Sequence, residues 1–325
     1  MIEVKNILVP VEIHENAAPV ATWAAMVARA TGSHLTLLHV NEAVEPIKTR
    51  LAFQGGGGLE PATIEQWRTQ YEQTTLMELK LLAEQCCTGV SVDTVLLEGR
   101  AHAAILEFVK TTACDLVVMG THGRPWYQRV LLGSTTEAVL RVSSVPVLIV
   151  HNTIPTQPAP RLTRVLFPTD FSPASGAGEE WIGYLVTHGV EEILLVHTVE
   201  NPLLDVYDPD KAEIDLRRIM EESRQHPPRS AQPFWDHAHR VAHAKLSAVR
   251  QQFLGAHFQV SQAEVLVGEG PAAEDILKVA QQKSPDLIVM ATHGRTGVRR
   301  LLLGSVTEKV VRAASCPVLA VPSRT

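Results

Sequence analysis

Two segments of the chain carry the same spacing of small residues, G-x2-G-x9-G-S, with one alanine in place of a glycine. The positions are Gly120, Gly123, Gly133 and Ser134 in the first segment, and Ala291, Gly294, Gly304 and Ser305 in the second. Each follows an apolar run, and the final Gly-Ser precedes a segment of helical spacing. Glycines allow unusual backbone angles and close approach to a ligand. Free amides at a helix start favour an anion such as phosphate. A serine there can bind a phosphate oxygen or cap its own helix, and a loop that only turns the chain is the alternative.

These two segments belong to a long internal repeat. Residues 116–150 and 287–321 align without gaps and share 21 of 35 positions, at an offset of 287 − 116 = 171. The segments KNILVPVE and TRVLFPTD, which end at Glu12 and Asp170, are related by an offset of 170 − 12 = 158. The second half therefore has 171 − 158 = 13 extra residues in its middle. The chain is a tandem duplication.

Each half alternates short apolar runs with segments of helical spacing. In the first half, strands are expected at 7–11, 34–40, 90–97, 115–119 and 146–150, and helices at 16–31, 61–86, 102–111 and 134–141. The second half repeats this order, with a longer connection at about 199–232. The pattern predicts an α/β fold of two tandem Rossmann-like domains, each a five-stranded, mostly parallel sheet with helices on both faces. We place the domains at 1–151 and 162–325, joined by a Pro-rich linker at 152–161.

The composition excludes several classes of protein. The chain has 325 residues, 45% hydrophobic and 20% charged, with a formal net charge of −6. Disorder needs fewer apolar residues, and general nucleic-acid binding needs a basic surface. The sequence has no apolar run that could span a membrane and no secretory signal at its start. The four cysteines have neither CxxC nor metal-ligand spacing. We therefore expect a cytoplasmic protein with reduced thiols, and no nucleic-acid or membrane partner.

The glycine spacing resembles the ATP-binding signature G-x2-G-x9-G-[ST] of the universal stress protein family. The starts ILVPVE and VLFPTD resemble the first strand of that family, which usually ends in an aspartate that reaches the ribose. LLHV and LLVHT resemble its second strand, and PVLIV and PVLAV its last. Together these segments cover nearly the whole chain. It looks like a tandem two-domain member, with domains of the adenine nucleotide alpha hydrolase-like type.

The resemblance implies that the second half holds the better nucleotide site. It assigns these residues to the nucleotide: Pro168, Thr169, Asp170, Thr198, Met290, Ala291, Gly294, Arg295, Gly304, Ser305, Val306 and Thr307. Asp170 would accept hydrogen bonds from the ribose hydroxyls, and Met290 would pack on the adenine. Backbone amides would surround the phosphates, with Arg295 adding charge and Thr307 a hydroxyl. An alternative for Asp170 is to cap the helix near Pro173.

The first half keeps the glycines but departs from the family elsewhere. Glu12 stands where aspartate is usual, and Pro125-Trp126-Tyr127 replaces Thr296-Gly297-Val298 in the loop. We therefore expect unequal sites, with the first altered or empty. The corresponding residues of this weaker site are Pro10, Val11, Glu12, Val40, Met119, Gly120, Gly123, Gly133, Ser134 and Thr135.

The resemblance implies a regulatory protein of the general stress response that binds ATP or another adenine nucleotide and is not an enzyme. Mg²⁺ could bridge the ATP phosphates. Bound ATP would favour a conformation or a surface that an unidentified protein partner recognises. A weak ATP hydrolase or phosphotransferase is one alternative, although the sequence offers no evident base or Walker-type carboxylate. A nucleotide-free scaffold for protein partners is another. Members with one domain usually pair through their last strands, so 146–150 and 317–321 could pair within this chain, as a monomer or in a homodimer.

Four further features have plainer interpretations. Four glycines at 55–58 lack the Lys-Ser or Lys-Thr of a P-loop and suit a flexible connection. His237, His239 and His243 lie on one expected helix, where a solvated face is favoured over a metal site. The loop histidines His122 and His293 could act as a base or contact phosphate, but partial exposure and a role in positioning the backbone are favoured. The cysteines Cys114 and Cys316 flank strands and are expected in the core.

Overall fold

The computed structural model describes residues 2–13, 17–42, 61–121, 132–151, 162–200, 232–254, 262–293 and 303–323. The first half consists of β1 (Asn6–Pro10), α1 (Ala17–Thr31), β2 (His34–Asn41), α3 (Pro61–Cys86), β3 (Val92–Glu98), α4 (Ala101–Thr111), β4 (Leu116–Gly120), α5 (Ser134–Val142) and β5 (Val147–Val150). The second half consists of β6 (Arg164–Pro168), α6 (Ser175–Val186), β7 (Glu192–Val199), α9 (Gln232–Leu254), β8 (Gln262–Glu269), α10 (Ala272–Lys283), β9 (Leu287–Ala291), α11 (Ser305–Ala313) and β10 (Val318–Val321). The expected order of strands and helices is confirmed, with strand ends displaced by one or two residues.

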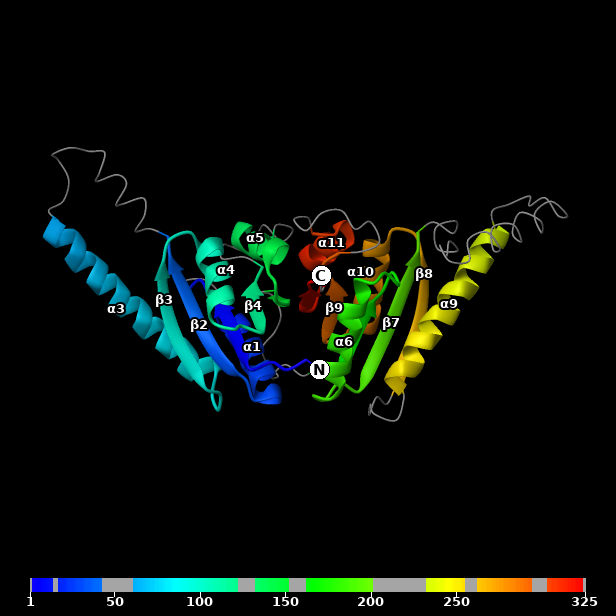
Figure 1. Ribbon diagram of the computed structural model, residues 1–325, viewed down its shortest axis with the longest axis horizontal. Helices are drawn as coiled ribbons and strands as arrows, with labels where there is room; N and C mark the ends of the chain where they lie inside the picture. Colours follow the sequence, from blue (N-terminus) through cyan, green and yellow to red (C-terminus); the bar gives the residue numbers. More distant parts are fainter. Residues whose placement is uncertain are drawn as a thin grey trace, which may run out of the picture.

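All ten of these strands form one sheet, in the order β3-β2-β1-β4-β5-β10-β9-β6-β7-β8. Strands within each half are parallel, whereas β5 and β10 pair antiparallel, with Leu148 opposite Leu319. The last strands of the two halves therefore pair within one chain, a pairing that the family resemblance implied was possible. The long helices α3 and α9 lie at the two outer ends of the molecule (Figure 1).

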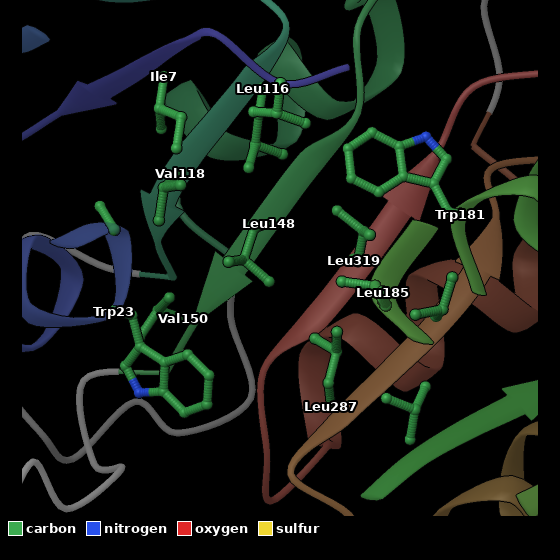
Figure 2. Packing of buried hydrophobic residues seen from close by; sticks show 14 of the residues in the cluster. Ile7, Trp23, Leu116, Val118, Leu148, Val150, Trp181, Leu185, Leu287 and Leu319 are labelled. Carbon is green, nitrogen blue, oxygen red and sulfur yellow. The ribbon is translucent and has the colours of Figure 1, made fainter. Parts of the chain in front are cut away.

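Helices cover both faces of the sheet, so its strands are apolar on both sides. One face packs against α1, α3, α6 and α9, and the other against α4, α5, α10 and α11. Near the centre, Trp23 of α1 and Trp181 of α6 occupy equivalent positions of the repeat and are both buried. Figure 2 shows them on opposite sides of Leu148 and Leu319. The two halves thus share one continuous core.

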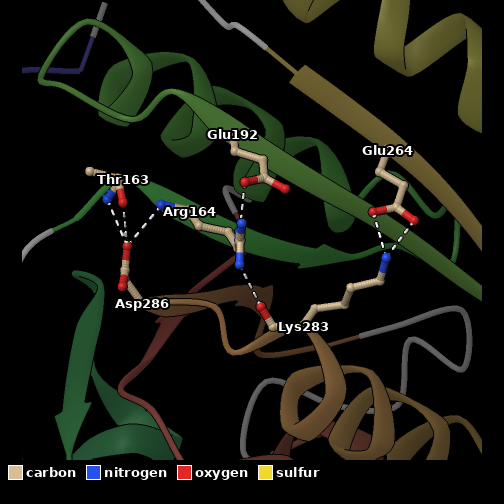
Figure 3. Close-up of polar contacts among 6 residues, drawn as sticks. All are labelled: Thr163, Arg164, Glu192, Glu264, Lys283 and Asp286. Atoms are coloured by element: carbon tan, nitrogen blue, oxygen red, sulfur yellow. Dashed lines mark hydrogen bonds and ion pairs between the residues drawn. The ribbon is translucent and has the colours of Figure 1, made fainter.

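An aspartate in each half ties the first strand to the fourth. In the second half, Asp286 accepts hydrogen bonds on Oδ2 from the amides of Thr163 and Arg164, both at 2.8 Å (Figure 3). In the first half, Asp115 Oδ2 accepts from the amides of Lys5 and Asn6, at 2.8 and 2.9 Å. These bonds fix the start of each first strand, and so fix where its other end emerges.

The helices that follow the two glycine segments contact each other across the halves. Arg312 of α11 lies 3.2 Å from Glu137 of α5, and its guanidinium also pairs with Glu308 at 2.8 Å. The imidazole Nε2 of His151 lies 2.9 Å from the carbonyl oxygen of Val311. The two candidate sites are therefore joined by polar contacts as well as by the sheet.

None of the helices in the described part of the chain has the length and apolar character needed to cross a bilayer. All four cysteines are free, and Cys114 and Cys316 are buried in the core as predicted.

Burial should make three of these thiols unreactive. It raises the pKa of Cys87 and of Cys114 to about 11, and that of Cys316 to about 12. Since the thiolate is the nucleophile, at pH 8 these groups stay protonated. We expect iodoacetamide to label the half-exposed Cys86 in the native protein and all four cysteines in urea. Peptide mass spectrometry would measure this, and native labelling of Cys316 as fast as that of Cys86 would contradict it.

Candidate functional site

The candidate site of the second half lies where the strand order of its sheet reverses. The chain runs from β6 to β7 and β8 on one side, then returns to β9 on the other side of β6. Parallel α/β sheets bind ligands beyond the carboxyl ends of their strands at such a point. Here Asp170 follows β6, and Thr292 and His293 follow β9. The topology therefore brings the predicted carboxylate next to the base of the glycine segment.

Short hydrogen bonds orient the half-buried carboxylate of Asp170. Its Oδ1 accepts from the amide of Ser172 at 3.0 Å and from the hydroxyl of Ser175 at 2.6 Å. Phe171 has a left-handed φ of 59°, which turns the chain sharply after the strand. The N-cap of α6 is Ala174, so Asp170 does not occupy that position. The capping alternative is therefore replaced by a turn that holds the carboxylate in place.

A buried histidine supports the same turn from below, a role that sequence reasoning missed. His197 Nδ1 lies 2.8 Å from the carbonyl oxygen of Thr169, and its ring lies 4.5 Å from that of Phe171, centroid to centroid. In the first half, the equivalent His39 Nδ1 lies 3.0 Å from the carbonyl oxygen of Val11. Because a carbonyl can only accept, Nδ1 carries the proton in both. The shared offset of 158 was the signal for this pair.

Two hydrogen bonds close the base of each glycine segment. The amide of Gly304 donates to the carbonyl of Thr292 at 2.8 Å, and the hydroxyl of Thr307 donates to that of Ala291 at 2.8 Å. In the first half, Gly133 donates to Thr121 at 2.7 Å, and Thr136 to Gly120 at 2.8 Å. Thr307 is also buried. The predicted contact of its hydroxyl with a phosphate would require this hydrogen bond to break.

The helix starts differ from the prediction in a way that favours an anion. Gly133 and Gly304 are the N-caps, and the exposed Ser134 and Ser305 are the first helical residues, with no side-chain cap on either helix. Both glycines have an ordinary φ of −59°. At Gly304 it is close approach that disfavours a side chain, since a β-carbon would lie 3.1 Å from the oxygen of Thr292. Among the residues that the structure describes, no side chain accepts a hydrogen bond from the first amides of α11.

The side chains expected near the base line the same end of the sheet. Thr169, Thr198 and Met290 are buried. Val306, which was assigned to the phosphates, packs against the core cluster that contains Met290. The Thr198 hydroxyl donates to Asp275 Oδ2 of α10 at 2.8 Å. Sequence reasoning missed Asp275, although its place in the repeat, where the first half has alanine, could have revealed it.

Several predicted residues lie outside the described part of the chain. They are Gly123, Gly294 and Arg295 of the two glycine segments, the loop residues His122, Pro125-Trp126-Tyr127 and Thr296-Gly297-Val298, the glycines at 55–58 and the linker.

The first half has a less polar version of this site. Glu12 is exposed, and Ala17 stands where the second half has Ser175, so the hydroxyl that orients Asp170 has no counterpart there. Val11 and Val40 replace Thr169 and Thr198. The residues Pro10, Met119, Gly120, Gly133, Ser134 and Thr135 keep the positions expected from the repeat.

The histidines on α9 bind acidic and polar neighbours. His239 Nε2 lies 2.9 Å from Glu269 Oε1, and His243 Nδ1 lies 3.4 Å from the hydroxyl of Ser247. In the described residues, no three His, Cys, Asp or Glu side chains are grouped so as to hold a metal ion. His293 Nδ1 lies 2.9 Å from the hydroxyl of Thr292, next to the base of the loop.

A parallel sheet with a carboxylate after one strand and an uncapped helix beside the next defines an α/β protein of the Rossmann-like class. The sequence profile of the universal stress protein family matches residues 3–151 and 162–322. The chain belongs to the universal stress protein family, with two copies of its domain.

Two curated relatives and one solved structure agree with this. A universal stress protein of Mycolicibacterium smegmatis is 26% identical over 322 residues, which covers 98% of this chain and 97% of that protein. Universal stress protein MJ0577 of Methanocaldococcus jannaschii is 27% identical over 161 residues, 49% of this chain and 93% of its own length. The fold is similar to that of a universal stress protein from Archaeoglobus fulgidus, with a TM-score of 0.62, 20% identity and 98% of both chains covered.

Proposed function

We propose that the second half binds ATP, or another adenine nucleotide, and that the bound state regulates a protein partner in the stress response. The observation that carries this proposal is the pairing of the oriented Asp170 carboxylate with the uncapped start of α11 at one switch point. A carboxylate suits ribose hydroxyls, and free helix amides suit phosphates.

Different residues of this site bind the ribose, the phosphates and the base. Asp170 accepts hydrogen bonds from the ribose. The amides of Ser305 and Val306 face the phosphates, where the macrodipole of α11 favours negative charge. Met290 and Thr198 supply an apolar wall and a polar group for the base. Mg²⁺ would enter with the phosphates, since the described residues offer no metal cluster of their own.

The first half is proposed to bind an adenine nucleotide more weakly or not at all. It retains the uncapped helix at Gly133, but its carboxylate is the exposed Glu12 and its base end is apolar. Unequal sites would let one nucleotide per chain change the contact between α5 and α11, which the Glu137–Arg312 ion pair joins.

We further propose that the protein binds ATP without turning it over. Phosphoryl transfer needs a positioned nucleophile and neutralised charge. In the described residues, Ser172 and Ser175 both donate to Oδ1 of Asp170 and thereby hold the turn. Steady release of ADP that falls when Asp170 is replaced would instead favour the hydrolase alternative.

Nucleotide content and thermal stability test the proposal together. We expect the purified protein, loaded with ATP and Mg²⁺ and then washed, to release about one adenine nucleotide per chain on denaturation. At ATP a hundred times above Kd, binding should stabilise the folded state by about 2.7 kcal/mol and raise the melting temperature. Two nucleotides per chain would contradict unequal sites. No nucleotide and no thermal shift would favour the scaffold.

A further inference from the structure

A carboxylate on α10 lies over the sheet at the end of the candidate site, rather than in solvent. Asp275 Oδ2 accepts a hydrogen bond from the hydroxyl of the buried Thr198 at 2.8 Å. Its carboxyl group fills the space beside Gly268, where any β-carbon would overlap it. Glycine at the end of β8 is therefore required for this acid to reach β7.

The first half shows that the fold does not need this arrangement. The offsets of 158 and 171 place Val40, Leu97 and Ala104 where the second half has Thr198, Gly268 and Asp275. Leu97 and Ala104 pack against the apolar cluster on that face of the sheet. Three apolar residues therefore occupy this position in the first half. In the second half, the polar side chains of Thr198 and Asp275 take their place beside Gly268.

Stabilisation of the helix start does not account for Asp275. An acid in the first turn of a helix interacts favourably with its macrodipole, and the exposed Glu274 is already there. Glu200 Oε1 accepts a hydrogen bond from the amide of Ala272 at 2.6 Å. In the first half, Glu42 Oε1 accepts the equivalent hydrogen bond from the amide of Ala101 at 2.7 Å. The first amides of α4 and α10 are thus each bound by a glutamate. Asp275 is not needed for this role, and its carboxylate contacts the sheet.

The order of strands places Asp275 at the base end of a bound nucleotide. The amides proposed for the phosphates follow β9, and the carboxylate proposed for the ribose follows β6. Thr198 and Gly268 are the next-to-last residues of β7 and β8. These strands are consecutive in the sheet, so a nucleotide with its phosphates over β9 and ribose over β6 extends its base towards β7 and β8.

Resting on the function proposed above, we propose that Asp275, held by Thr198, reads the amino group of the base and so selects adenine over 6-oxo purines. A carboxylate can only accept hydrogen bonds. Among the described residues, the hydrogen bond from Thr198 engages Oδ2 of Asp275, which leaves Oδ1 to accept from the adenine N6 amino group. The O6 atom of hypoxanthine is an acceptor and would be repelled.

Comparison of ATP with ITP, which differ at this position of the base, tests the inference. By isothermal titration calorimetry we expect the unaltered protein to bind ATP at least about tenfold more tightly than ITP, because a site built for a hydrogen bond rejects a ligand that cannot make it. Asp275→Asn, whose amide can donate as well as accept, should bring the two affinities within about threefold.

A triple variant distinguishes loss of base recognition from misfolding. Thr198→Val, Gly268→Leu and Asp275→Ala together copy the packing of the first half, and should keep the melting temperature while abolishing the preference for ATP. Glu274→Gln, which removes an acid from the same helical turn, is the matched control and should leave the preference intact. Equal binding of ATP and ITP by the unaltered protein, or a preference that survives the triple variant, would overturn the inference alone. Binding of neither nucleotide would overturn the proposed function with it.

Discussion

Replacement of Asp170 by alanine is expected to weaken ATP binding by between tenfold and a hundredfold. Hydrogen bonds to a charged group contribute about 1.5–3 kcal/mol, and each 1.4 kcal/mol is a factor of ten in affinity. The carboxylate is held by Ser172 and Ser175, so the ligand does not have to order it. Titration calorimetry with ATP would measure the loss.

Glu12→Ala is the matched control, because Glu12 holds the equivalent place in the first half and is exposed. It should leave the affinity of the dominant site unchanged. Since Asp170 also holds its own turn, the melting temperature without nucleotide must be compared for both variants. Loss of ATP binding in Glu12→Ala, with Asp170→Ala unaffected, would assign the nucleotide to the first half.

A second large effect, on the stability of the fold, is expected in the core between β6 and α6. Phe167 of β6 is fully buried, and a β-carbon at Gly178 of α6 would lie 2.7 Å from its ring carbon Cε2. The first half has Val9 and Val20 at these positions. The ring needs the glycine, and two valines fill the same space in the other half.

Gly178→Val alone should therefore destabilise the protein by about 1–3 kcal/mol through overpacking. Phe167→Val alone should leave a cavity and cost more than about 1 kcal/mol. The double variant reproduces the pair of the first half and should recover much of the loss, with a coupling energy of about 0.5–3 kcal/mol. Chemical denaturation of the four proteins would give the cycle, and strictly additive losses would show that the ring and the helix are not in contact.

Much of the fold could be predicted from the sequence because its signals are local. The runs around Ile7 and Leu166 are apolar at consecutive positions, as in strands buried on both faces. Gly99 and Gly270, which follow β3 and β8, have positive φ values of 117° and 109° that favour glycine. The duplication, read from identical residues at fixed offsets, predicted that one half would repeat the other. The resemblance to the universal stress protein family implied that the last strands could pair.

The tertiary structure decided what depends on groups far apart in the chain. The family resemblance assigned the Thr307 hydroxyl to a phosphate, and only the folded chain shows that this hydroxyl donates to the carbonyl oxygen of Ala291, sixteen residues earlier, at 2.8 Å. Asp275 was not among the predicted site residues. Its bond to Thr198 spans 77 residues and depends on a glycine in a third element. Sequence spacing determines which backbone each residue adopts, whereas the partner of a buried polar group is determined by which strands and helices pack together.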